Sequence, residues 1–246
     1  MSDFNCWDLK PELVDLGDGE VHVWRAYLEC EQTVLRRFEA TLASDEKARA
    51  NRFLFQRDRN SFMVTRGVLR ELLGRYVNRP PAHLEFNYSP LGKPSLRAEL
   101  TERPVQFSVS HSHGMALLAF AVGRHLGVDV ELVRPDFSPE EIAGRYFSPR
   151  EVMELQALPP SLRAEGFFLC WTRKEAYVKA RGEGLHIPLV SFHVSLTPGQ
   201  PERLQCADSM HWSLRSIRPD PQYVGALVGE GRDWRLRSWD WKPECD

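Results

Sequence analysis

Residues 105–133 read VQFSVSHSHGMALLAFAVGRHLGVDVELV and contain three runs typical of β-strands. The first two, Gln106–Ser110 and Met115–Val122, flank a short polar connection, which favours a hairpin. The third, Leu126–Val133, alternates apolar and polar residues, so that one face is predicted to pack into a core while the other presents polar side chains. The middle of the chain is therefore predicted to be β-structure.

The elements predicted around this segment follow the same order twice: a strand, then helices, then strands. The first half has a strand at Glu20–Tyr27 and helices at Gln32–Leu42, from Ser44 toward Phe53, and at Arg57–Val77. The second half has helices starting after Ser138 and Ser148, a helix at Leu162–Arg181, and β-like runs at Val190–Ser195, His211–Ile217, Tyr223–Val228 and Trp234–Trp241. The halves meet near Gly123, which predicts an α+β fold of two similar lobes, 1–123 and 124–246.

Composition excludes several classes of protein. The 246 residues are 42% hydrophobic and 27% charged, as in a soluble globular protein. With 32 basic and 34 acidic residues the formal charge is -2, so no net basic field draws the protein to nucleic acid or anionic membrane, and any anion site is local. The five scattered cysteines lack CxxC spacing, which favours a reducing, cytoplasmic compartment. No signal-peptide layout is found, and the uncharged stretch 105–123 is too short in its apolar part to cross a bilayer.

Asp129 and Glu131 lie two residues apart in the third strand, so their carboxylates share one face. Adjacent carboxylates repel each other unless a cation lies between them, and hard oxygen ligands suit Mg²⁺. The pair thus predicts a magnesium site. The same pattern is also typical of a half-buried strand with a solvated outer face, and spacing alone does not separate the two interpretations.

The segment WTRKEAYVK, residues 171–179, places Glu175 and Lys179 on one face of the predicted long helix. An exposed Glu–Lys pair of this kind contributes only about 0.3–0.5 kcal/mol and needs no functional explanation. In the functional alternative, Glu175 completes a metal site beside Lys174, while Lys179 binds a phosphate oxygen. Spacing alone favours the exposed pair.

Two further groups of donors fit an anion. Ser110 and His111, with His113 nearby, suit an anion better than zinc, because no third His or Cys stands at ligand spacing. Lys93 lies in the LGKP turn, where glycine lets the backbone approach a ligand closely. The early helix adds Lys47, Arg49 and Arg52. The alternatives are a solvated helix face for the arginines and core-satisfied histidines, the latter preferred for His113.

Taken together, these segments resemble the Sfp-type 4′-phosphopantetheinyl transferases. The motifs occur in the family's order over roughly residues 44–195: GKP at 92–94, FSVSHS at 107–112, GVDVE at 127–131, FSPRE at 147–151, WTRKEAYVK at 171–179 and GEGL at 182–185. No single motif is specific, but the pair GVDVE and WTRKEAYVK at this separation is strong. Ser108 stands where Asn is frequent in the family.

The resemblance implies two α/β lobes related by a pseudo-twofold axis, each a small antiparallel sheet packed with helices, with coenzyme A in the cleft between them. The implied reaction transfers the 4′-phosphopantetheine arm of coenzyme A to a serine of an apo acyl or peptidyl carrier protein. It depends on Mg²⁺ and releases adenosine 3′,5′-bisphosphate. The implied enzyme is a cytoplasmic monomer that serves fatty acid, polyketide or non-ribosomal peptide biosynthesis.

Residue roles carried over by position follow from the same resemblance. Asp129, Glu131 and Glu175 would bind Mg²⁺, and Glu175 would also be the base for the incoming serine, directly or through water. Lys179 would neutralise charge on the pyrophosphate or leaving group, so the catalytic set is Glu175, Lys179 and Asp129. The predicted coenzyme A contacts are Arg49, Lys93, Ser110, His111, Lys174 and Lys179.

Two other functions remain open at this level. A metal-dependent nucleotide pyrophosphohydrolase would use the same carboxylates and lysines, but it would need no protein acceptor. A scaffold that binds carrier proteins or coenzyme A without turnover is the non-enzymatic alternative, and the joint presence of Asp129, Glu175 and Lys179 argues against it.

The segment with Arg134 and Phe137 and the stretch Tyr146–Arg150 are the predicted docking surface for an acidic carrier protein.

Overall fold

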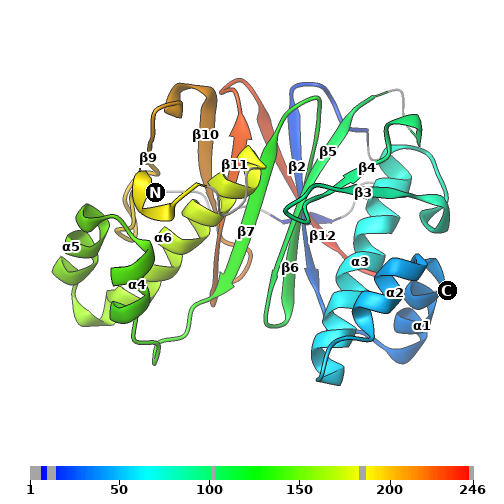
Figure 1. Ribbon diagram of the computed structural model, residues 1–246, viewed down its shortest axis with the longest axis horizontal. Helices are drawn as coiled ribbons and strands as arrows, with labels where there is room; N and C mark the ends of the chain where they lie inside the picture. The colour runs from blue at the N-terminus through cyan, green and yellow to red at the C-terminus, as the bar shows by residue number, and fades with distance from the viewer. Residues whose placement is uncertain (1–6, 10–14, 101–102, 183–186, 244–246) are drawn as a thin grey trace.

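The structure is a computed structural model that describes residues 7–9, 15–100, 103–182 and 187–243. Two lobes lie side by side, each with helices packed against a sheet (Figure 1). The helices are α1 (Gln32–Thr41), α2 (Ser44–Ala50), α3 (Gln56–Tyr76), α4 (Glu140–Tyr146), α5 (Pro149–Ala157) and α6 (Pro160–Arg181). The strands are β1 (Asp8–Leu9), β2 (Glu20–Tyr27), β3 (Phe86–Tyr88), β4 (Pro94–Leu96), β5 (Val105–Ser112), β6 (Met115–Val122), β7 (Leu126–Leu132), β8 (His193–Val194), β9 (Leu204–Gln205), β10 (Trp212–Ile217), β11 (Tyr223–Glu230) and β12 (Arg235–Trp241). The α+β fold class agrees with the prediction.

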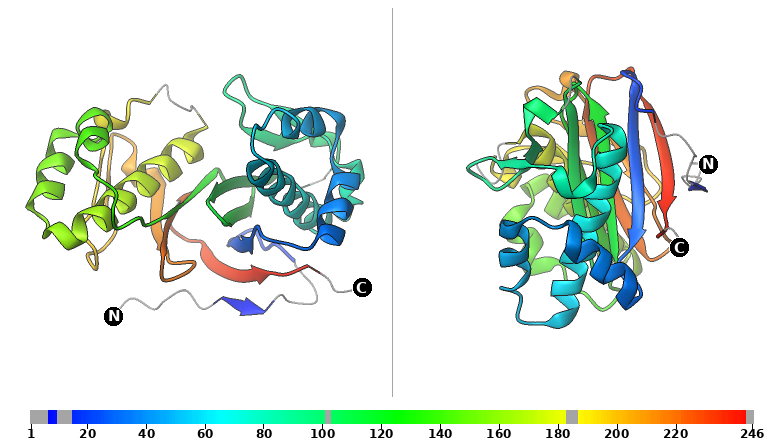
Figure 2. Two further views of the ribbon diagram at one scale, coloured as in Figure 1. Left: turned by 90° about the horizontal axis from the view of Figure 1, so that it is seen from below. Right: turned by 90° about the vertical axis from the view of Figure 1, so that its right-hand side faces the viewer.

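The sheet of the first lobe has the order β1-β12-β2-β6-β5. Strands β2, β6 and β5 are antiparallel neighbours, whereas β12 pairs parallel with β2 and β1 pairs parallel with β12. The last strand of the chain therefore returns to the first lobe, with β1 at the outer edge beyond it (Figure 2). A division at residue 123 does not separate the two sheets, and this sheet is mixed rather than purely antiparallel.

The second lobe has a three-stranded antiparallel sheet in the order β10-β11-β7. Helix α6 packs on this sheet, and α4 and α5 lie beyond it (Figure 1). A glycine at 127 in β7 is required by this packing, because any Cβ there would overlap the backbone oxygen of Ala176 and the nitrogen of Ala180 in α6. The close approach sets β7 directly against the helix that contains Glu175 and Lys179.

The uninterrupted apolar run of β6 is explained by burial of both its faces. Leu118 and Phe120 pack into the core of the first lobe, formed with α3. Leu117 and Ala119 face the other way, against Val128 of β7 and the strands of the second lobe. A strand between two cores needs no polar face, which is why this run does not alternate.

Most predicted elements are confirmed, with local differences in how they begin. Ser148 caps α5 as expected, and its hydroxyl accepts a hydrogen bond from the Glu151 N–H. Ser44 lies inside α2, and Ala43 is its N-cap. The LGKP turn, residues 91–94, belongs to the connection of the short β3–β4 hairpin, with Pro94 as the first residue of β4. The Glu183–Leu185 part of the GEGL motif lies outside the described residues.

No helix in the described part of the chain is long and apolar enough to span a membrane.

Candidate active site

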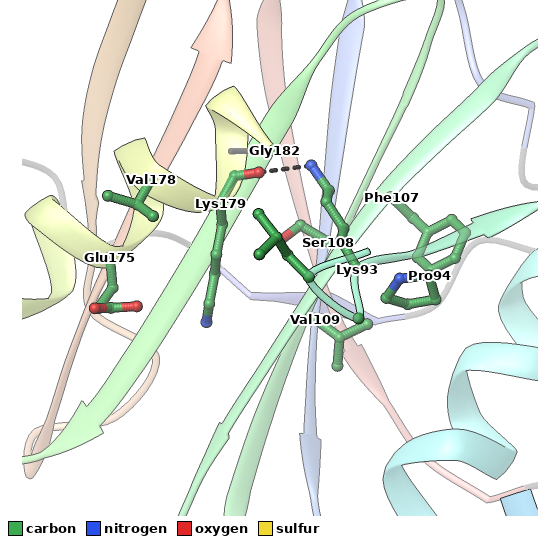
Figure 3. A pocket seen from close by; sticks show the side chains of 11 residues that line it. Lys93, Pro94, Phe107, Ser108, Val109, Glu175, Val178, Lys179 and Gly182 are labelled. Carbon is green, nitrogen blue, oxygen red and sulfur yellow. Dashed lines mark hydrogen bonds between the residues drawn. The ribbon is translucent and has the colours of Figure 1, made fainter. Parts of the chain in front are cut away.

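A pocket of about 260 Å³ opens between the lobes (Figure 3). Its first-lobe wall consists of the 91–94 turn and residues 107–109 of β5. Its second-lobe wall comes from α6, through Glu175, Val178, Lys179 and the helix C-cap Gly182. Gly182 has φ 70°, a left-handed conformation that glycine adopts without strain and that ends the helix at the pocket. Both walls belong to one chain.

Asp129 lies buried beside this pocket, on the strand next to α6. Its Oδ1 accepts hydrogen bonds from the Ser110 hydroxyl and from the Lys179 ammonium, each at 2.7 Å. Its Oδ2 is also buried and has no hydrogen-bond partner among the described residues. A buried carboxylate oxygen without a donor is costly unless something else binds it.

Glu131 and Glu175 share the negative field of Asp129. Burial raises the pKa of both carboxyls, and the charge of Asp129 raises each further. Glu131 Oε2 accepts a hydrogen bond of 2.6 Å from Ser112, and the charge of Lys179 partly offsets the effect on both glutamates. Within the described residues, no three His, Cys, Asp or Glu side chains stand close enough to form a ready metal site. The chemistry of the donor set still fits a hard cation, which would relieve the mutual repulsion.

Lys93 joins the two lobes across the pocket (Figure 3). Its ammonium donates to the backbone oxygen of Lys179 at 2.6 Å and to that of Leu126 at 3.4 Å. Burial, and then the charge of Lys179, lower the pKa of Lys93 to about 8. The predicted lysine of the LGKP turn therefore does lie at the pocket, next to Lys179.

His111 and Arg49 form the more exposed part of the basic region. Desolvation lowers the pKa of His111 first, and the positive charges of Lys179 and Arg49 lower it further. Arg49 is exposed on α2, with its guanidinium 5.3 Å from the ring centre of Phe62. The structure thus brings Arg49, His111 and Lys179 into one electrostatic neighbourhood, although they come from α2, β5 and α6.

Two predicted coenzyme A contacts have other partners. Lys174 is fully buried in the second lobe, where its ammonium donates to the backbone oxygens of Leu189 and Phe192 at 2.7 Å and pairs with Glu151 at 2.8 Å. Neighbouring residues on a helix point about 100° apart, so Lys174 turns into the core while Glu175 faces the pocket. The Ser110 hydroxyl donates a hydrogen bond to Asp129. The structure therefore does not place Lys174 at the pocket, where its predicted contact with coenzyme A would be made.

Three residues of importance here were given no role from the sequence: Ser108, Ser112 and Glu151. Ser112 binds Glu131, Ser108 accepts the Val128 N–H, and Glu151 holds Lys174. The alternation of serines in FSVSHS is the signal for the first two, because residues two apart on a strand share a face.

Comparison with known proteins finds two matching family models, one on each side of residue 123. A model described as 4′-phosphopantetheinyl transferase, N-terminal, matches residues 29–122, and one described as 4′-phosphopantetheinyl transferase superfamily matches residues 125–228. The 4′-phosphopantetheinyl transferase HetI of Nostoc sp. is 40% identical over 235 residues, which cover 96% of this chain and 98% of that protein. The chain belongs to the 4′-phosphopantetheinyl transferase family.

Other members of the family are also similar to this transferase. A 4′-phosphopantetheinyl transferase of Bacillus subtilis is 30% identical, covering 80% of this chain and 86% of its own. The crystal structure of Thermotoga maritima holo-[acyl-carrier-protein] synthase aligns over 44% of this chain and 63% of its own, at 22% identity and a TM-score of 0.36. As a member of the family, the enzyme transfers 4′-phosphopantetheine from coenzyme A to carrier proteins. This excludes the pyrophosphohydrolase and the non-catalytic scaffold as its main function.

Proposed function

We propose that this transferase acts with Mg²⁺ held by Asp129, Glu131 and Glu175 at the edge of the interlobe pocket. The observation that carries the proposal is Asp129 Oδ2, which is buried without a partner beside two carboxyls of raised pKa. A cation bound there would neutralise the pyrophosphate of coenzyme A and stabilise the charge that develops on the leaving group.

Glu175 is proposed as the base. The serine oxygen of the carrier forms a bond to the phosphorus that bears the pantetheine arm, and the pyrophosphate bond to adenosine 3′,5′-bisphosphate breaks. Glu175 takes the serine proton, directly or through water; its place in the pocket wall beside Lys179 supports this role. Lys179, already at the pocket, neutralises the departing phosphate.

The adenine end and 3′-phosphate of coenzyme A are proposed to lie against His111, Arg49 and Lys93. The mutual electrostatic effects of Arg49, His111 and Lys179 support a single anion-binding region. The pKa of His111 is lowered by burial and by the charges of Lys179 and Arg49, and a bound phosphate would raise it again, which would make the ring a better donor to that phosphate.

The carrier protein is proposed to dock over the cleft beside His113. On the second-lobe side, Arg134 stacks on the ring of Phe137 at 4.8 Å. The charges of Arg134 and Arg57, one from each lobe, both act on His113. On the first-lobe side, Leu54 and Phe55 are 94% and 69% exposed, next to Arg57. Apolar side chains beside arginines fit an acidic carrier protein with an apolar patch.

We further propose that the enzyme works as a cytoplasmic monomer. Support for the monomer is that one chain supplies both walls of the pocket. Support for a reducing compartment is that Cys30, Cys170 and Cys206 are free thiols.

The test is mass spectrometry of a panel of apo acyl, polyketide and peptidyl carriers after incubation with coenzyme A and Mg²⁺. We expect a mass gain on a carrier serine, loss of the gain in excess chelator, and recovery when Mg²⁺ is restored. Full transfer in chelator would overturn the metal assignment. The range of carriers modified defines the partners.

A further inference from the structure

The facing edges of the two lobes are not joined by a backbone ladder. Strand β5 is the last strand of the first sheet and β7 is the last strand of the second, and within the described residues no strand of one sheet pairs with a strand of the other. Strand edges present unpaired N–H groups that need partners when they are buried. Val128 of β7 is fully buried at this junction, so its N–H must be satisfied by a side chain.

Serine hydroxyls of β5 make these contacts. Ser108 Oγ accepts the N–H of Val128 at 3.1 Å, and Ser112 Oγ accepts the N–H of Leu132 at 3.4 Å. Ser110 and Ser112 donate their protons to Asp129 and Glu131 at 2.7 and 2.6 Å. All three serines are buried, and we call them the serine seam (Ser108, Ser110 and Ser112).

The donors on Asp129 are arranged on one side of its carboxylate. Ser110 and Lys179 both bind Oδ1, whereas Oδ2 has no partner among the described residues. Glu131 accepts its serine bond through Oε2. Two neighbouring carboxylates repel each other, and a hydroxyl fixed to one oxygen of each holds both in place while another oxygen stays available for a ligand.

Ser112 also contacts the next residue, His113. Ser112 has one proton, which goes to Glu131, so the contact of 3.1 Å with His113 Nδ1 requires the histidine to donate. His113 has φ 54°, a left-handed conformation that is costly for a residue with a Cβ. This conformation sets the ring beside Ser112, in a chain of donors from His113 through Ser112 to Glu131.

We propose that Ser110 and Ser112 are positioning residues that orient Asp129 and Glu131 for the cation, while Ser108, which lines the pocket, binds neither carboxylate and joins the lobes through the Val128 N–H. The inference rests on the metal site proposed above. Removal of a hydroxyl that orients a metal ligand typically weakens metal binding by roughly 10–100-fold.

The experiment titrates Mn²⁺ into the purified transferase with saturating coenzyme A and follows free Mn²⁺ by electron paramagnetic resonance. We expect Ser110→Ala and Ser112→Ala to raise the Mn²⁺ dissociation constant about tenfold or more. Ser112→Thr, which keeps the hydroxyl, should restore most of the affinity. Ser108→Ala is the comparison variant from the same strand face, because Ser108 lines the pocket but contacts neither carboxylate. It should lower the melting temperature and change the dissociation constant far less than Ser110→Ala or Ser112→Ala.

Each remaining outcome decides against a specific statement. If the two alanine variants bind Mn²⁺ as tightly as the wild type, the positioning role is wrong while the metal site stands. If Ser108→Ala weakens binding equally, the effect is one of lobe register, and the assignment to Ser110 and Ser112 is overturned. If the wild-type enzyme with coenzyme A binds no more Mn²⁺ than coenzyme A alone, the metal site itself fails, and the inference falls with it.

Discussion

Glu46 in the first lobe and Glu151 in the second occupy matching places. Each lies in a short helix, α2 or α5, that precedes the long helix of its lobe. Glu46 accepts the N–H of Ala43 at 2.9 Å and Glu151 accepts that of Ser148 at 2.7 Å, so both cap their own helices. Both are buried, and each pairs with cations from the long helix that follows.

The two long helices differ in what else they do. In α3, Arg66 and Arg70 both bind Glu46, with Nε–oxygen distances of 2.5 and 2.7 Å, and serve the first lobe alone. In α6, Lys174 binds Glu151, while the next residue, Glu175, faces the pocket. The same framework of capped helix and buried ion pair thus stabilises both lobes, and α6 has a second face that is used for chemistry.

The largest effect should come from the pocket face of α6 and from the carboxylate of β7 that lies beside it. We expect Asp129→Ala and Glu175→Ala each to reduce transfer about 100-fold or more, since each removes a group that stabilises charge in the transition state. Far-UV circular dichroism should stay native. Glu99→Ala, which removes an exposed carboxylate of the first lobe, is the control and should keep full turnover. Near wild-type turnover by either pocket variant at limiting Mg²⁺ would contradict its assignment.

The helix cap and the buried ion pair can be disrupted in either lobe by replacing the glutamate with uncharged glutamine. Glu46→Gln and Glu151→Gln each leave buried cations uncompensated and should lower the free energy of unfolding by about 3–5 kcal/mol. Urea denaturation measures both losses. We expect kcat to fall also in Glu151→Gln, because Glu151 pairs with Lys174 of α6, and α6 positions Glu175 at the pocket. A Glu151→Gln protein as stable as the wild type would show that the two ion pairs are not equivalent.

Local sequence patterns predicted the elements well, and the pairings between distant segments poorly. Strict alternation gave the Leu126–Val133 strand, and the S-x-x-E spacing gave the cap at Ser148. The return of β12 to the first lobe depends on packing between chain ends, which no local pattern encodes. Helical spacing separates Lys174 from Glu175 but does not say which of them is buried. The serine seam required two strands to be placed edge to edge, so FSVSHS alone showed only that its serines share a face.

The exposed basic residues should discriminate between two forms of the substrate. We expect His111→Ala and Arg49→Ala each to weaken the binding of coenzyme A by about tenfold, since a charge-assisted hydrogen bond contributes roughly 1.5–3 kcal/mol. Binding of 3′-dephospho-coenzyme A should change little, because the lost contact is to the 3′-phosphate. Calorimetric titration with both ligands measures the difference, and Arg36→Ala, at an exposed position of α1, is the control and should leave both affinities unchanged. An equal loss for both ligands would place these residues elsewhere on coenzyme A.

Lys93 should give a smaller, pH-dependent effect on stability at the junction of the lobes. Its pKa is about 8 in the folded protein, below the ordinary value of 10.5. Between these values the unfolded chain binds a proton that the folded chain does not, so the contribution of Lys93 to stability rises with pH in this window. The free energy of unfolding of the wild type minus that of Lys93→Met should therefore increase from pH 8 toward pH 10. A flat difference for Lys93 would contradict its lowered pKa.

Reversing Arg150 should have the smallest effect, because this side chain already has partners. Its guanidinium donates to Glu154 at 2.9 Å and to Gln205 at 3.1 Å, although 58% of the side chain is exposed. A rim charge acts mainly on association. We therefore expect Arg150→Glu to raise the KM for the carrier protein only a few-fold at low salt, to flatten its salt dependence, and to leave the KM for coenzyme A unchanged.

The matched control makes the same charge change away from the proposed docking surface. Arg36→Glu, at an exposed position of α1, should leave both KM values unchanged. The new carboxylate at 150 also faces Glu154 one turn away, a repulsion of only about 0.2–0.5 kcal/mol, so stability should barely change. If the carrier KM of Arg150→Glu is unchanged at low salt, Arg150 is only a partner of Glu154 and Gln205. The docking surface then narrows to Arg134, Phe137 and the apolar residues on the opposite rim.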